Sequence, residues 1–188
     1  MARHQVFALL ELPPLHWSRW FELVAANDRG YIPALVEVGA TPAEIASVRA
    51  ADRAAQGITA AQEVAAEKAI ARRETYADGR LILIRLPHAR AATVTDRLQP
   101  ELGGPGYDNL IVLSPDEINF YGRGALVRRL EQTFAGGWYG GALPEYGYWG
   151  HGTLLPSITA VLDCLEQALE SPSPVFRLPD RYNRHPHP

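Results

Sequence analysis

The residues best suited to chemistry lie in a glycine-rich and aromatic segment in the second half of the chain. Residues 136–151 hold six glycines and five aromatic residues, among them Trp138, Tyr139 and Trp149. Glycines let several backbone amides converge on one anion, and aromatic rings offer faces on which a nucleobase can stack. His151 can donate a hydrogen bond to a phosphate oxygen or act as an acid or base. The segment therefore predicts a site for a phosphate-bearing ligand; the alternative is a long loop whose aromatic rings pack over a sheet edge.

A second candidate is Arg123, which stands between Gly122 and Gly124. It follows a predicted strand and precedes a predicted helix, and α/β sheets place their ligands at strand ends. The planar guanidinium group suits phosphate and carboxylate oxygens. By itself the pattern is more typical of a surface arginine, and both interpretations stay open at this point.

Composition limits the class of protein. The chain has 188 residues, of which 47% are hydrophobic and 21% charged, and its net charge is −3. This length and apolar content predict a folded domain and exclude a disordered chain. There is no apolar run of about 18 residues and no secretory signal, so we expect a cytoplasmic protein that does not engage a membrane. The net acidity disfavours a nonspecific binder of duplex DNA.

The first part of the chain is helical in pattern. Apolar residues spaced three and four apart predict an amphipathic helix over residues 15–26, ended by a turn at 27–30. Thr41 and Thr59 each open a capping box, a hydroxyl followed three residues later by Glu or Gln. The two boxes predict a helical hairpin over residues 41–76, whose alanine-rich second helix runs to about Thr75.

After Gly79 the pattern changes to alternating strands and helices. The expected elements are a strand at 80–86, a helix at 93–102, strands at 109–113 and 118–121, a helix at 124–134, a loop to His151 and a helix at 156–170. The turn between the last two strands is tight, so these strands should be antiparallel. The fold class is therefore α/β: an N-terminal helical segment and then a small mixed-sheet domain of order β-α-β-β-α-loop-α.

Residues 109–113, 117–124 and 136–151 together resemble the DHH-associated domain. This domain is the carboxy-terminal, substrate-binding half of the DHH phosphoesterase superfamily. The family pattern is a strand that ends in an arginine-bearing turn, a helix, and a glycine run before a histidine. The resemblance implies that Arg123 and His151 contact substrate phosphate and that Gly136 and Gly137 form the phosphate cradle.

The resemblance extends upstream and divides the chain. Residues 23–33 resemble the end of a DHH catalytic half, where Asp28 matches a metal-ligating aspartate. Residues 1–40 would then be the helical remnant of that half. The other implied parts are a helical linker at 41–78, the DHH-associated-type domain at 79–170 and a proline-rich tail at 171–188.

The metal-binding half of the family is what the chain lacks. DHH phosphoesterases usually use manganese, and two-metal hydrolysis needs several carboxylates and histidines. The sequence has no Asp-His-His triplet, and Asp28, His4 and His16 are too few for a cage of two ions. We therefore expect no cofactor in this chain alone and no catalysis by it alone.

Three functions follow from these observations. The first is a phosphate-ligand-binding module for nucleotides, oligonucleotides or single-stranded nucleic acid, with Trp138, Tyr139 and Trp149 as base-stacking residues. Such a module would act with a separate DHH catalytic subunit that carries manganese. The second is a noncanonical metal-dependent phosphodiesterase built on Asp28, His16 and His151. The third is an assembly module whose aromatic residues cover a partner protein or a second copy of the chain.

Overall fold

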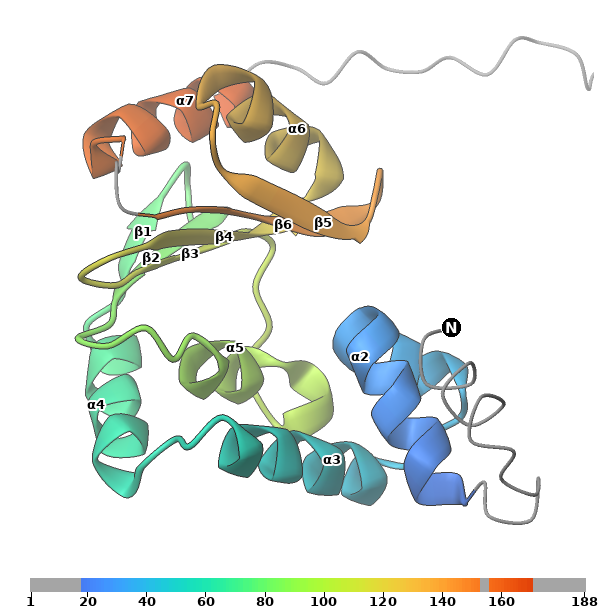
Figure 1. The fold of residues 1–188 in the computed structure, drawn as a ribbon. Coiled ribbons are helices and arrows are strands. Elements are labelled where there is room, and N and C mark those ends of the chain that lie inside the picture. The colour runs from blue at the N-terminus through green and yellow to red at the C-terminus, as the bar shows by residue number, and fades with distance from the viewer. Residues whose placement is uncertain (1–17, 153–155, 171–188) are drawn as a thin grey trace, which may run out of the picture.

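A six-stranded mixed sheet forms the centre of the structure, a computed structural model that describes residues 18–152 and 156–170 (Figure 1). The strand order is β1-β2-β3-β4-β6-β5. The strands are β1 (Glu74–Tyr76), β2 (Leu81–Arg85), β3 (Leu110–Leu113), β4 (Ile118–Arg123), β5 (Trp138–Ala142) and β6 (Tyr146–His151). β2 and β3 are parallel and the other neighbouring pairs are antiparallel, including the predicted β3–β4 pair. The predicted α/β class with a mixed sheet is confirmed.

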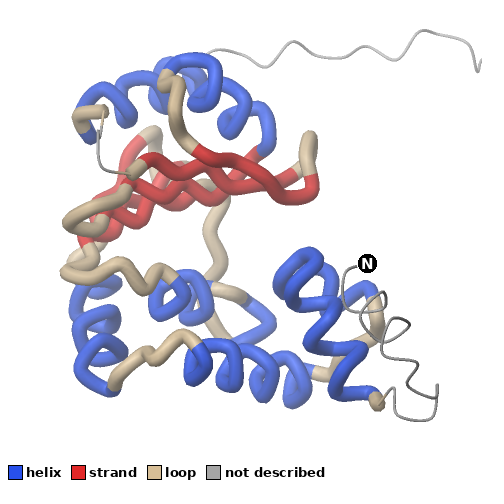
Figure 2. Tube along the Cα trace, in the orientation of Figure 1, coloured by secondary structure: helices blue, strands red, loops and turns tan. Residues whose placement is uncertain are grey.

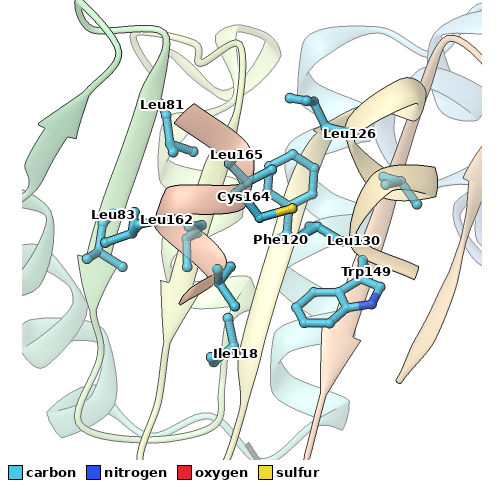
Figure 3. Packing of buried hydrophobic residues seen from close by; sticks show 13 residues of the cluster. Leu81, Leu83, Ile118, Phe120, Leu126, Leu130, Trp149, Leu162, Cys164 and Leu165 are labelled. Atoms are coloured by element: carbon cyan, nitrogen blue, oxygen red, sulfur yellow. The ribbon is translucent and has the colours of Figure 1, made fainter. Parts of the chain in front are cut away.

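Helices α6 (Gly124–Thr133) and α7 (Ile158–Glu170) cover one face of the sheet (Figure 1). Successive strand residues point to opposite faces, so every second residue of β4 and β6 enters the core under these helices. Figure 3 shows Phe120 of β4 and Trp149 of β6 in this core, with Leu130 of α6 and Cys164 of α7. The single cysteine of the chain, Cys164, is buried in this core.

The opposite face of the sheet is covered by α4 (Ala60–Ala71) and α5 (Ala92–Leu98). Their side chains pack on β2 and β3, where Ile84 and Val112 are both buried. A 3₁₀ turn, η2 (Pro100–Leu102), follows α5, so the helix predicted over residues 93–102 is broken before Pro100. Helices therefore flank the sheet on both sides, as the blue and red segments of Figure 2 show.

Helices α2 (Arg19–Glu37) and α3 (Pro42–Ala55) form a third apolar cluster beside this core. The turn predicted at 27–30 is a kink at Gly30 and Tyr31, after which the helix resumes. Both predicted capping boxes are present: the Thr41 and Thr59 hydroxyls accept hydrogen bonds from the backbone amides three residues later. In Figure 1, α3 and α4 meet at an angle rather than side by side as a hairpin.

Two other expectations are corrected. Residues 136–151 are not a loop, because most of them form the antiparallel pair β5–β6. The alanine-rich helix ends at Ala71 instead of near Thr75, and Glu74–Tyr76 pairs with β2 as strand β1. Residues 1–17 and 171–188 lie outside the described part, and with them His4, His16 and the proline-rich tail. None of the helices described combines the length and apolar character that crossing a bilayer requires.

Candidate functional site

The pairing of β4, β6 and β5 gathers aromatic side chains on one face of the sheet. Tyr148 lies opposite Tyr121, Tyr146 lies opposite Arg123, and Trp138 lies opposite Gly150. Trp149 enters the core under α6 and α7, so by strand alternation its neighbour Tyr148 points to the other face. The same alternation places Trp138, Tyr146 and Tyr148 together on that other face, and we call these three residues the aromatic face.

The aromatic face is open to solvent. Trp138 is 44% exposed, Tyr148 43% and Tyr146 37%. The helices that cover this side of the sheet pack on β2 and β3, which leaves the rings on β5 and β6 accessible. Folded monomers rarely leave neighbouring large apolar rings exposed unless a ligand or partner uses them.

Glycines beneath the rings determine how they lie. A Cβ atom added to Gly150 would stand 2.4 Å from the indole Nε1 and Cε2 atoms of Trp138, so the indole lies across the sheet directly over this glycine. A Cβ atom on Gly140 would likewise stand 2.6 Å from the Tyr148 hydroxyl oxygen. Glycine therefore allows both rings to lie close to the backbone, with their other faces toward solvent.

Tyrosine hydroxyls anchor one end of the aromatic face. The Tyr107 hydroxyl shares a hydrogen bond with the Tyr146 hydroxyl and accepts one from Nε2 of Gln99 at 3.3 Å. Burial raises the pKa of Tyr146 to about 12, although the Tyr107 hydrogen bond lowers it. Burial also raises the pKa of Tyr121, which packs beside the second core cluster. These hydroxyls are therefore neutral at physiological pH and add no negative charge that would repel an anion.

Arg123 stands at the end of β4 and is the N-cap residue of α6, the position predicted for it. Its backbone amide donates to Oδ1 of Asn109 at 3.2 Å, which fixes the main chain. Its side chain is 59% exposed, and its Nη2 lies 3.6 Å from Oδ2 of Asp108. Such exposed ion pairs contribute little free energy, so a phosphate can replace Asp108 as the partner of this guanidinium group.

The structure separates Arg123 from the other residues predicted to hold phosphate. Arg123 pairs with Tyr146 at the start of β6, whereas His151 is the last residue of that strand. Five residues of extended strand separate the two positions by roughly 16 Å. The predicted convergence of Arg123 and His151 on one anion is therefore corrected, because an extended hairpin holds its two ends apart.

His151 lies with Gly136 and Gly137 at the other end of the hairpin. Its side chain is 8% exposed, and each ring nitrogen is 3.3 Å from a backbone carbonyl oxygen, that of Gly152 or Ala135. A Cβ atom on Gly136 would stand 3.8 Å from Nε2, and one on Gly137 would stand 2.4 Å from the Gly150 carbonyl oxygen. These glycines therefore bring the chain close around a buried histidine whose ring nitrogens both face protein oxygens.

The predicted base-stacking residues are also divided. Trp149 is 1% exposed and belongs to the core, so its ring offers no face to a ligand, which corrects that prediction. Tyr139 is 42% exposed but lies on the opposite face of the sheet from Trp138, with the Arg128 guanidinium 4.9 Å from its ring centre. Trp138 alone of the three belongs to the aromatic face. The other two residues of the aromatic face are Tyr146 and Tyr148. Their spacing of two residues, typical of one face of a strand, is the sequence signal that identifies them.

Among the residues that the structure describes, Asp28 belongs to no cluster that could hold a metal ion. Asp28 is exposed on α2. Across residues 18–152 and 156–170, no three His, Cys, Asp or Glu side chains are placed to hold a metal ion together. His4 and His16, the other candidates, lie outside the described residues.

A buried ionic network between α2, α3 and α5 had no signal in the sequence. Asp96 on α5 is 3% exposed and accepts hydrogen bonds from Tyr31 of α2 and from Arg49 and Arg53 of α3. The Arg49 guanidinium also stacks over the Tyr31 ring, 4.5 Å from its centre. The network joins three helices, and no local signal in the sequence links residues so far apart.

Comparison of the chain with models of known protein families and with curated proteins gives no match. The resemblance to the DHH-associated domain therefore rests on the quoted motifs, and the function is argued below from the geometry of the aromatic face.

Proposed function

We propose that this chain is a binding module for phosphate-bearing ligands with bases, that is, nucleotides, short oligonucleotides or single-stranded nucleic acid. In this proposal bases stack on Trp138 and Tyr148, and Arg123 contacts a phosphate. The observation that carries the proposal is the Trp138 indole lying over Gly150 with its outer face exposed. Aromatic rings on an open sheet face are a recurrent way of binding single-stranded nucleic acid.

The arrangement of the rings supports more than one base. Trp138 and Tyr148 stand on neighbouring antiparallel strands, two residues out of direct register. Diagonal neighbours of this kind have Cα atoms about 7–8 Å apart, so each ring can accept a separate base. Stacking is tolerant of sequence because every base has a π face. We therefore expect binding with weak base preference.

Electrostatics support a local phosphate contact rather than a general one. The chain carries a net charge of −3, so the protein as a whole does not attract polyanions. Arg123 next to Tyr146 supplies positive charge at one end of the aromatic face. Because few phosphates would be neutralised, we expect only a shallow dependence of affinity on salt concentration.

The test is titration of a fluorescently labelled oligothymidylate with the protein, followed by anisotropy at low salt. A base stacked on an aromatic ring contributes about 1–3 kcal/mol, so Trp138→Ala should weaken binding about 5- to 150-fold. Tyr139→Ala is the matched control, because Tyr139 is similarly exposed, adjacent in sequence and on the opposite face. Equal affinities of wild type and Trp138→Ala would refute the proposal.

The resemblance adds a partner to this proposal. A separate DHH-type subunit carrying manganese would perform hydrolysis of the bound ligand, and both would act in the cytoplasm. Arg123→Ala should then raise the KM of the assembled enzyme more than it lowers kcat, because Arg123 binds substrate rather than reacting.

The exposed rings also favour a second candidate, association with a protein, including a second copy of this chain. Large aromatic residues are frequent anchors of protein interfaces. Light scattering over a range of concentrations distinguishes the two. A dimer that Trp138→Ala dissociates supports the interface, whereas a monomer that binds oligothymidylate supports the ligand site.

A further inference from the structure

A basic groove lies between α4 and the end of β2. Its volume is about 400 Å³, within the range of small-ligand sites. Its lining consists of Ala65, Lys68, Ala69, Arg72, Arg85 and Pro87. None of these residues belongs to the aromatic face, so the groove is independent of the proposed function.

Cationic residues line this groove. Lys68, the single lysine of the chain, lies on α4, and Arg72, the C-cap residue of that helix, lies one helical turn later. Arg85, the last residue of β2, also borders the groove, but strand alternation directs its side chain to the sheet face of Leu81 and Leu83, opposite α4. Like charges four residues apart on a helix repel each other, so this pair does not stabilise α4 by itself.

The charges of the groove are largely uncompensated. In the part of the chain that the structure describes, neither Lys68 nor Arg72 has a side-chain hydrogen bond or ion pair. The acidic residues of α4 face elsewhere, since Glu63 and Glu67 both engage Arg97 of α5. One carboxylate lies near, that of Glu74, which accepts from Nε of Arg85 at 2.7 Å and from the Tyr76 hydroxyl at 2.8 Å.

The shape and position of the groove suit a small anion. Ala65 and Ala69 leave space along α4 where longer side chains would fill it. Arg85 is the last residue of β2, which is parallel to β3, and Pro87 follows the end of that strand. Ligands of parallel strands bind outside their carboxyl ends.

We infer that this groove binds a phosphate group, either inorganic phosphate or the terminal phosphate of a small phosphorylated molecule. Lys68 supplies a point charge, and the guanidinium group of Arg72 supplies paired donors that match phosphate oxygens. The Arg85 guanidinium keeps its bond to Glu74 and adds positive charge near the groove. The apolar Ala69 and Pro87 side chains bound the groove beside the charges.

The test is isothermal titration of the full chain with inorganic phosphate, with pyrophosphate and with adenosine monophosphate at low ionic strength. The double variant Lys68→Gln/Arg72→Gln should weaken binding about tenfold or more, because hydrogen bonds to charged groups are the strong ones. Arg73→Gln is the matched control: it is adjacent in sequence, does not line the groove and already donates to the Ile70 carbonyl. Wild type that binds none of the three anions at millimolar concentration would overturn the inference, as would a double variant that binds them like wild type.

A second pair of variants makes the test independent of the folding of the double variant. Ala65→Glu places a carboxylate in the groove, and Ala61→Glu places the same charge on α4 outside it. Loss of phosphate binding in Ala65→Glu alone supports the site, and equal binding in both refutes it. Trp138→Ala should leave the binding of inorganic phosphate and pyrophosphate unchanged, so failure here and failure at the aromatic face are distinguishable. Tighter binding of adenosine monophosphate than of inorganic phosphate that persists in Trp138→Ala would identify a phosphorylated metabolite as the ligand of the groove.

Discussion

Arg49 and Asp96 form an ion pair that is almost completely buried, with Nη2 of the arginine 3.0 Å from Oδ1 of the aspartate. The arginine side chain is 5% exposed and the aspartate side chain 3%. The pair connects α3 with α5, and Nη1 of Arg49 reaches Oδ1 of Asn27 on α2 at 2.8 Å. It therefore ties the N-terminal helices to the layer that supports the sheet.

Removing the aspartate should strongly destabilise the fold. Asp96→Ala leaves the buried Arg49 guanidinium without its main anionic partner and removes the acceptor of the Tyr31 hydroxyl, which lies 2.7 Å away. Breaking a buried ion pair from one side costs about 3–5 kcal/mol. We expect a loss of that size in the free energy of unfolding measured by urea denaturation.

The control for Asp96→Ala is an exposed ion pair on the same helical layer. Glu37 pairs with Arg29 at 3.3 Å, and their side chains are 71% and 56% exposed. Glu37→Ala should change the free energy of unfolding by at most about 1 kcal/mol. Similar losses in the two variants would contradict a special role for the buried pair.

Four tyrosines with raised pKa values predict loss of stability at alkaline pH. Burial raises the pKa of Tyr31, Tyr107 and Tyr121 above the usual value, and it raises that of Tyr146 to about 12. Between the pKa of the unfolded chain and the raised pKa of the folded protein, the tyrosine hydroxyl is protonated only in the folded state. Rising pH therefore favours unfolding in this range. The stabilisation is complete below about pH 10, the usual tyrosine pKa, and is lost as the pH rises above it.

Urea denaturation between pH 8 and pH 12 measures this effect. The free energy of unfolding should be level near pH 8 and should fall steadily above about pH 10. Tyr31→Phe removes one of the titrating hydroxyls, so its slope above pH 10 should be smaller than that of wild type. A slope that is unchanged in this variant would exclude Tyr31 as a contributor.

The sequence predicted elements wherever the signal is local. The capping boxes at Thr41 and Thr59 determine where α3 and α4 begin, and the buried apolar runs of β2 and β3 are recognisable without tertiary context. The β5–β6 hairpin was missed because its glycines are typical of loops, although here they make room for neighbouring rings. The predicted grouping of Trp138 with Tyr139 was therefore wrong. Consecutive residues of a strand point to opposite faces of the sheet, whereas a loop imposes no such separation.

Two glycines beside the candidate site should respond differently to alanine. A Cβ atom on Gly124 would stand 2.1 Å from the Pro144 carbonyl oxygen, and this backbone cannot move without displacing the β5–β6 turn. Gly124→Ala should therefore lower the free energy of unfolding by about 1–3 kcal/mol. The three atoms nearest to a Cβ atom on Gly150, at 2.4–2.7 Å, all belong to the indole of Trp138, a side chain that is 44% exposed and can turn toward solvent.

Gly150→Ala should accordingly spare the fold and impair binding. In this variant the indole of Trp138 can no longer lie along the sheet, so the affinity for oligothymidylate should fall. Tryptophan fluorescence should report greater exposure of the Trp138 ring to solvent. Urea denaturation of both variants, with anisotropy titration of each, separates the two effects. Gly150→Ala that binds like wild type would show that the orientation of the indole does not matter.

His151 and Arg123 should give opposite results, because one is buried and the other is exposed. His151→Ala removes a ring that packs 5.9 Å from Trp149 and whose nitrogens face two carbonyl oxygens. Loss of such buried contacts costs about 1–3 kcal/mol, so the free energy of unfolding should fall while affinity for oligothymidylate is retained. Arg123→Ala removes a side chain that is 59% exposed, so stability should be unchanged and affinity should fall. The opposite result would place the phosphate beside His151, Gly136 and Gly137. In that case His151→Ala would abolish binding although the variant is fully folded, and Arg123→Ala would bind like wild type.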